Sequence, residues 1–114
     1  LRGGLFETMV ISDFKKQFYN LGAEPSCYFW RDQGGYEVDS IIETALKNIP
    51  IEIKSSLTYN THFLDKLAKW NEIANTSPKD NVLVYGGDLE MDSSQGRIVS
   101  WKNSGNLIEK IIKS

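Results

Sequence analysis

The sequence has 114 residues, a length typical of one domain with a hydrophobic core of its own. Its 13 basic and 15 acidic side chains give a formal net charge of −2, less basic than expected of a strong, sequence-independent DNA-binding protein. No apolar run is long enough to cross a bilayer, and no secretory signal peptide is visible. The single cysteine, Cys27, cannot form an internal disulfide, so we predict a cytoplasmic protein without a membrane partner.

The first helix is predicted over residues 5–21, followed by Gly22 as a C-terminal cap. Its apolar positions recur on one face and are Phe6, Val10, Phe14, Phe18 and Leu21. Glu7 and Gln17 fall inside the same arc at about 100° per residue. An inward carboxylate is costly unless it is paired, so Glu7 requires a partner if it points into the fold.

Three short strands are predicted next. Residues 26–44 read as a β-hairpin around a turn at 32–35. A third strand over residues 48–55 alternates, with its isoleucines on one face and Glu52 and Lys54 on the other. The connection before it is short, so the three strands are expected to form an antiparallel meander.

The rest of the chain predicts a second helix, two more strands and a closing helix, over residues 61–75, 82–85, 97–101 and 107–112. Asn60 or Thr61 is the expected N-cap of the second helix. The apolar stripe of that helix contains Phe63, Leu64, Leu67, Trp70, Ile73 and Ala74. Residues 92–96 read as a polar loop. This order predicts an α/β domain with helices packed on a mixed sheet.

Two short segments carry the candidate chemistry, Glu37-Val38-Asp39 and Glu52-Ile53-Lys54. If their strands run side by side, Asp39 lies beside Glu52, and two carboxylates near a strand end suit Mg²⁺ or Mn²⁺. Such a metal polarises a phosphate and lowers the pKa of a bound water. Lys54 would orient that water or stabilise developing charge, and Glu7 would support the ligands.

Each of these residues also has a purely structural interpretation. Glu52 and Lys54 are equally compatible with a solvated strand face that forms a weak cross-strand pair. Glu37 and Asp39 would keep their strand soluble, and Glu7 would interact favourably with the dipole of the first helix. Their joint occurrence in this order favours the metal site, with Glu37 as a bystander.

The order Glu7, Asp39, Glu52-Ile53-Lys54 resembles the PD-(D/E)xK restriction-endonuclease-like superfamily. More closely, the chain resembles the C-terminal domain of bacterial and archaeal AAA-type ATPases of unsettled role, through residues 4–7, 28–32, 37–39, 50–56 and 84–88. The resemblance implies a restriction-endonuclease-like mixed central sheet flanked by helices. It also implies metal-ligand roles for Asp39 and Glu52, a catalytic role for Lys54 and the helix acid for Glu7.

The resemblance further implies that residues 1–114 are one domain of a longer protein, with ATP bound only by an upstream P-loop domain. One position departs from the superfamily pattern. Many active members carry Gln or Tyr on the helix after the lysine, where this chain has Lys66, Lys69 and Trp70.

Three functions follow as hypotheses. The first is an enzyme, a Mg²⁺- or Mn²⁺-dependent deoxyribonuclease domain coupled to the ATPase. The second is a module that docks DNA, a protein or the upstream ATPase domain without catalysis, which the near-neutral charge favours. The third is a domain that assembles the longer protein into oligomers.

Overall fold

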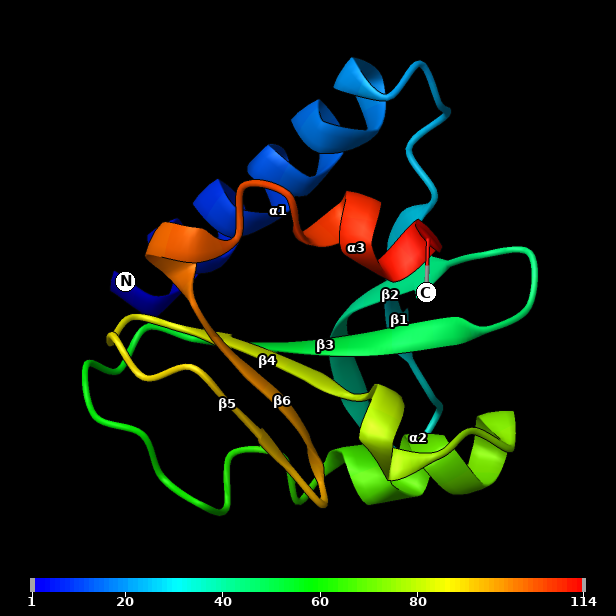
Figure 1. The fold of residues 1–114 in the computed structure, drawn as a ribbon. Coiled ribbons are helices and arrows are strands. Elements are labelled where there is room, and N and C mark those ends of the chain that lie inside the picture. Colours follow the sequence, from blue (N-terminus) through cyan, green and yellow to red (C-terminus); the bar gives the residue numbers. More distant parts are fainter. Residues whose placement is uncertain (1, 114) are drawn as a thin grey trace.

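The computed structural model describes residues 2–113 of the chain, with side chains described over residues 4–113. One six-stranded mixed sheet forms its centre, in the order β1-β2-β3-β4-β6-β5 (Figure 1). The first three strands are antiparallel, β3, β4 and β6 are parallel, and β5 is antiparallel to β6. Their bounds are β1 (Cys27–Arg31), β2 (Glu37–Glu43), β3 (Asn48–Lys54), β4 (Val82–Tyr85), β5 (Met91–Ser93) and β6 (Gly96–Ser100). The predicted mixed sheet and antiparallel meander are confirmed, whereas β5 lies partly in the predicted polar loop.

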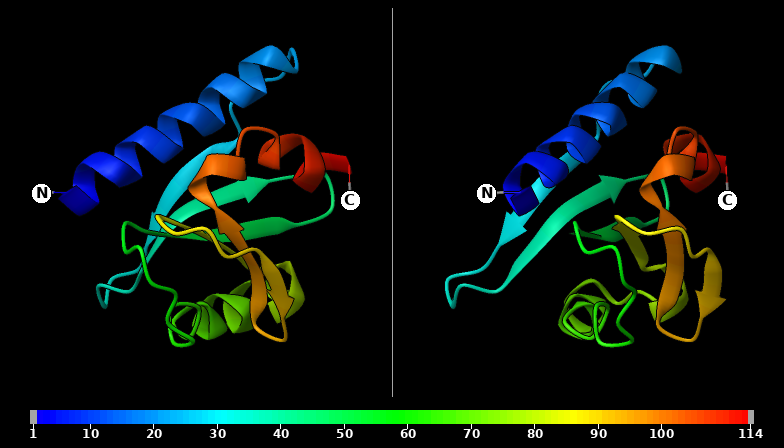
Figure 2. Two further views of the ribbon diagram at one scale, coloured as in Figure 1. Left: turned by 60° about the vertical axis from the view of Figure 1, so that its left-hand side comes forward. Right: turned by 90° about the vertical axis from the view of Figure 1, so that its left-hand side faces the viewer.

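Helices cover both faces of the sheet. Helices α1 (Arg2–Asn20) and α3 (Leu107–Lys113) pack on one face, and α2 (Leu67–Ala74) packs on the other (Figure 2). Two short 3₁₀ helices, η1 (Pro78–Asp80) and η2 (Trp101–Asn103), lie in the connections. Within residues 2–113, no helix combines the length and the apolar character needed to cross a membrane.

The four-residue repeat of α1 points into the core. Val10, Phe14 and Phe18 are buried against the isoleucines of β3, and Phe6 packs at the edge of this cluster. Leu21, expected on the same face, is 42% exposed. The helix ends at Asn20, although the Leu21 N–H still bonds to the Gln17 oxygen at 3.1 Å, and the backbone then turns through Gly22 at φ 69°. Leu21 therefore stands at the end of the helix, outside the buried cluster.

Gln17, the polar residue within the apolar arc, joins α1 to the C-terminal part of the chain. Its Nε2 donates to the backbone oxygen of Ser104 at 2.7 Å and to Asp13 Oδ2 at 2.7 Å. Its Oε1 accepts from the backbone N–H of Ile108 at 2.9 Å, at the start of α3. Both polar ends of this buried amide are therefore satisfied, and a first-turn N–H of α3 gains a partner.

Replacing Gln17 with leucine is expected to lower the free energy of unfolding by roughly 1–3 kcal/mol, because the buried N–H of Ile108 loses its side-chain partner and the Ser104 carbonyl keeps only the N–H of Leu107. Urea denaturation of the variant measures this loss. Lys16→Leu is the matched control, since Lys16 precedes Gln17 on the exposed side of α1. A Gln17→Leu variant as stable as the control would show that these hydrogen bonds do not hold α3 in place.

The second predicted helix is shorter than expected. Residues 61–66 form consecutive turns, and the regular helix begins only at Leu67. Their backbone bonds span three residues, as between the Phe63 N–H and the Asn60 oxygen at 3.0 Å, and Asn60 Oδ1 accepts from the His62 N–H at 2.8 Å. Asn60 therefore opens a turn and does not cap the helix. The predicted burial of Ile73 in the apolar stripe is wrong, because its side chain is 53% exposed. The polar side chain of Asn71 is buried on α2 instead.

Candidate functional site

Asp39 lies where β2 separates from β3. The paired residues run from Glu43 opposite Asn48 to Ser40 opposite Ile51, and the pairing stops before Asp39. The backbone N–H of Ile53 donates instead to Asp39 Oδ2 at 2.8 Å. The carboxylate thus replaces a strand partner, and this contact fixes Asp39 beside the Glu52-Ile53-Lys54 segment, as predicted.

Glu52 is the most unusual residue of the sheet, because its side chain is 0% exposed. It stands on the face of β3 that α2 covers, opposite the face of the isoleucines. When the group is ionised, its Oε1 has no hydrogen-bond donor among the described residues. The Lys66 ammonium lies 3.0 Å from Oε2 and supplies a charge there. Oε1 is left without a partner, and a buried ionised carboxylate in that state is strongly disfavoured.

Glu7 reaches the same cluster from α1, as the helix pattern predicted. Its side chain is hydrogen-bonded to that of Asp39, and Asp39 is in turn hydrogen-bonded to Glu52. Asp39 is therefore the middle member of three acids that come from α1, β2 and β3. Glu37, the predicted bystander, forms an ion pair with Arg31 at 3.6 Å.

The three acids share protons. Burial, followed by the hydrogen bond and charge of Asp39, raises the pKa of Glu52 to about 8. The same causes raise the pKa of Glu7 to about 7. Burial opposes ionisation of Asp39 as well, but hydrogen bonds from Glu52, the Ile53 N–H and Glu7 outweigh it and lower its pKa. Below pH 7, protonated Glu7 and Glu52 therefore donate to ionised Asp39.

Lys66 supplies the positive charge of this cluster. Partial burial tends to lower the pKa of its ammonium, but the charges of Glu52 and Asp39 outweigh burial, and the pKa is raised. Two protons, one carboxylate and one ammonium make the cluster electrically neutral. The sequence identified Lys66 only as a departure from the superfamily pattern. Its position in a turn segment, next to the buried Leu67, offered no periodic pattern that marks an inward lysine.

Lys54, the predicted catalytic lysine, does not join the acids. Its ammonium lies 5.8 Å from the ring centre of Phe63, and it forms no ion pair within residues 4–113. Lys54 and Glu52 share a face of β3, yet the turn segment over residues 61–66 separates their contacts. Phe63 of that segment meets Lys54, and Lys66 meets Glu52.

The donor set fits a hard divalent cation in its chemistry. Asp39 and Glu52 offer carboxylate oxygens, which Mg²⁺ and Mn²⁺ prefer, and Oε1 of ionised Glu52 has no donor among the described residues. As they are placed, no three His, Cys, Asp or Glu side chains in the described part of the chain form a metal-binding group. The protons shared through Asp39 satisfy the electrostatics that a cation would otherwise satisfy.

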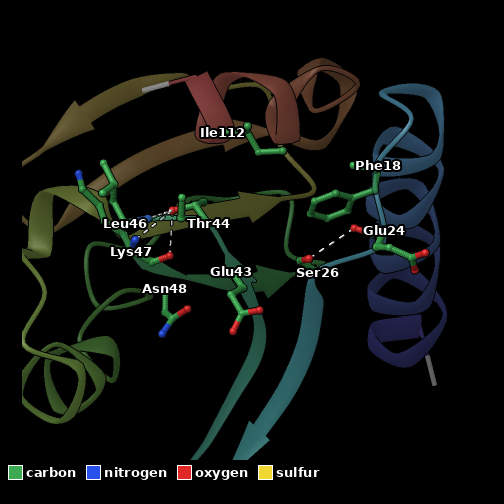
Figure 3. Close-up of a pocket in the computed structure, with 11 residues that line it drawn as sticks. Phe18, Glu24, Ser26, Glu43, Thr44, Leu46, Lys47, Asn48 and Ile112 are labelled. Atoms are coloured by element: carbon green, nitrogen blue, oxygen red, sulfur yellow. Dashed lines mark hydrogen bonds between the residues drawn. The ribbon is translucent and has the colours of Figure 1, made fainter.

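A cavity of about 680 Å³ lies at the opposite end of β2 and β3 (Figure 3). It opens between the end of α1, the β2–β3 connection and Ile112 of α3. Its hydroxyls have local partners, since Ser26 Oγ donates to the Glu24 oxygen at 3.4 Å and Thr44 Oγ1 to the Lys47 oxygen at 3.0 Å. Among the residues whose side chains are described, no unsatisfied buried polar atom lines this cavity, so the acidic cluster is the stronger candidate site.

Comparison with curated proteins and with solved structures found no match. Comparison with protein-family models found one that covers residues 2–103, from the start of α1 to the end of η2. That span contains all six strands and the whole acidic cluster. The chain therefore belongs to the family described as a domain of unknown function, DUF4143.

Proposed function

We propose that this domain binds Mg²⁺ or Mn²⁺ through Asp39 and Glu52 and hydrolyses phosphodiester bonds in DNA. The observation that carries the proposal is Glu52, a fully buried carboxyl on a central strand that lies beside a second carboxylate and whose Oε1 has no donor among the described residues once the group is ionised. Such a group does not help to stabilise the core, since burying an apolar residue at the same position carries no desolvation penalty for a charge. The resemblance to PD-(D/E)xK nucleases supplies the reaction class.

Each acid has a distinct role in this proposal. Asp39 and Glu52 would hold the cation, and Glu7, which is hydrogen-bonded to Asp39 while it is protonated, would lie behind Asp39 as an outer carboxylate. The Ile53 N–H fixes the other side of Asp39, so its carboxylate is restrained from two directions. A cation held there would supply Lewis-acid chemistry for the phosphate and for a water. The resemblance also supports an upstream AAA-type ATP-binding domain in the same protein as a partner.

Incubating the chain with supercoiled plasmid and Mn²⁺ tests the reaction. We expect nicking that Asp39→Ala and Glu52→Ala each reduce by roughly a hundredfold or more, because each removes a metal ligand. Glu72→Ala is the matched control, since Glu72 is exposed on α2. Nicking that survives both substitutions would show that another site, or a contaminant, cleaves the plasmid.

A docking function without catalysis is the second candidate, favoured by the position of Lys54 outside the acidic cluster. Calorimetry with Mn²⁺ separates the two functions. Binding that Glu52→Ala abolishes, in a chain that does not nick plasmid, identifies a metal-stabilised docking domain. Sedimentation of the protein with and without this domain then tests the third candidate, assembly into oligomers.

A further inference from the structure

We propose that Lys66, at the start of α2, is the lysine that works with the acidic cluster, in place of Lys54. The inference rests on the proposed function and names a residue that the Glu52-Ile53-Lys54 motif does not contain. Its role is to compensate the charge of Glu52 and to meet the phosphate group that approaches the site.

The contact between Lys66 and Glu52 is the first argument. The Lys66 ammonium lies 3.0 Å from Glu52 Oε2, and the two side chains are 40% and 0% exposed. Lys66 therefore lies between the buried carboxyl and the solvent. An anionic phosphate that approaches Glu52 from solvent meets this ammonium, which is a compact positive charge with three hydrogen-bond donors. A positive charge fixed in advance at the mouth of a site stabilises negative charge that develops there.

The backbone of Lys66 is held in place independently of its side chain. The Tyr36 hydroxyl donates to the Lys66 carbonyl and accepts from the Trp70 N–H at 3.1 Å. The ring of Tyr36 packs edge-on against Trp30, with ring centres 5.8 Å apart. The β1–β2 hairpin thus fixes the point from which the Lys66 side chain extends, and the ammonium reaches Glu52 at a smaller entropic cost.

Lys54 lacks the contact with an acid, although its backbone is held in β3. Its ammonium lies over the face of Phe63, a contact that is weak at exposed sites, and it has no acidic partner within residues 4–113. The turn segment over residues 61–66 therefore determines which lysine reaches the acids. When Glu52 is ionised, its buried Oε1 has no donor among the described residues, which is an independent indication that a ligand, and not only Lys66, belongs at this position.

Methionine substitutions of the two lysines test the proposal, with Mn²⁺ affinity from calorimetry and plasmid nicking as the readouts. Lys66→Met is expected to tighten Mn²⁺ binding about tenfold, because the acids lose their internal positive charge. The same variant is expected to lose nicking by roughly a hundredfold, and Lys66→Arg to restore part of it. The matched control is Lys79→Met, an exposed lysine of η1, which should change neither readout.

Each outcome decides the assignment. Nicking that requires Lys54 and is unaffected by Lys66→Met overturns the Lys66 proposal while the proposed function stands. If the chain binds Mn²⁺ but does not nick plasmid, the Mn²⁺ affinity of Lys66→Met tests the role of Lys66. An affinity equal to that of the wild type overturns the Lys66 proposal. A wild-type chain that neither binds Mn²⁺ nor nicks overturns the proposed function and the role of Lys66 together. Circular dichroism and thermal unfolding confirm that each variant is folded.

Discussion

Replacing Glu52 with glutamine is expected to make the folded chain more stable at pH 9 by a few kcal/mol and to leave it nearly unchanged at pH 5. The pKa of Glu52 is raised from 4.5 to about 8 by folding. Such a group contributes stability fully below pH 4.5 and loses that contribution as the pH rises through about 8. At pH 9 the wild-type protein holds an ionised carboxylate in a buried site, whereas glutamine is neutral and can still donate to Asp39.

Urea denaturation at pH 5, 7 and 9 measures this effect. The wild-type free energy of unfolding should fall across the series, and that of Glu52→Gln should fall less steeply. Glu7 contributes in the same direction, so some slope remains. Glu72→Gln, an exposed change on α2, should follow the wild type. A Glu52→Gln variant with the wild-type slope would show that another group carries the pH dependence.

The affinity for Mn²⁺ is expected to rise by roughly a hundredfold or more between pH 6 and pH 8, because a cation must displace the protons that the acids share. Glu7 and Glu52 hold their protons at pH 6, given pKa values of about 7 and about 8. Above these values both carboxylates are ionised, and a divalent cation compensates charge that otherwise destabilises the fold. The bound metal should therefore also reverse the loss of stability at high pH.

Isothermal titration calorimetry in buffers of different ionisation enthalpy counts the protons released. Up to two protons should leave per Mn²⁺ bound at pH 6. Glu7→Gln should release one fewer and reduce the gain in affinity by roughly tenfold, since one titrating group is gone. Binding of equal strength at both pH values would place the cation away from the three acids.

Much of the fold could be predicted from local pattern. The alternation of isoleucine with Glu52 and Lys54 predicted strand β3 and the face on which each side chain lies, because successive strand residues point in opposite directions. The four-residue repeat of α1 gave its buried side for the same kind of reason. The prediction of helix over residues 61–66 was wrong, because apolar residues spaced three and four apart in sequence also occur in a series of turns, here one that begins at Asn60. Strand β5 was missed because three residues paired at a sheet edge carry almost no pattern.

The acidic members of the site could be predicted, but their charge partner could not. Asp39, Glu52 and Glu7 each stand in an element whose direction follows from periodicity, and the structure brings all three together. Lys66 lies in the turn segment, where no period relates sequence position to direction. Its contact with Glu52 depends on how α2 docks against the sheet and on the hydrogen bond from Tyr36.

The sequence by itself determined the strands and helices, the faces on which the acids stand and the family to which the chain belongs. These properties are local, since they follow from side-chain periodicity and from the order of residues. Only the tertiary structure decided that Glu52 is fully buried, that two protons and Lys66 balance the three acids, and that Lys54 lies outside the cluster. Burial and charge compensation depend on neighbours that are distant in sequence, and those neighbours are set by the packing of α1 and α2 on the sheet.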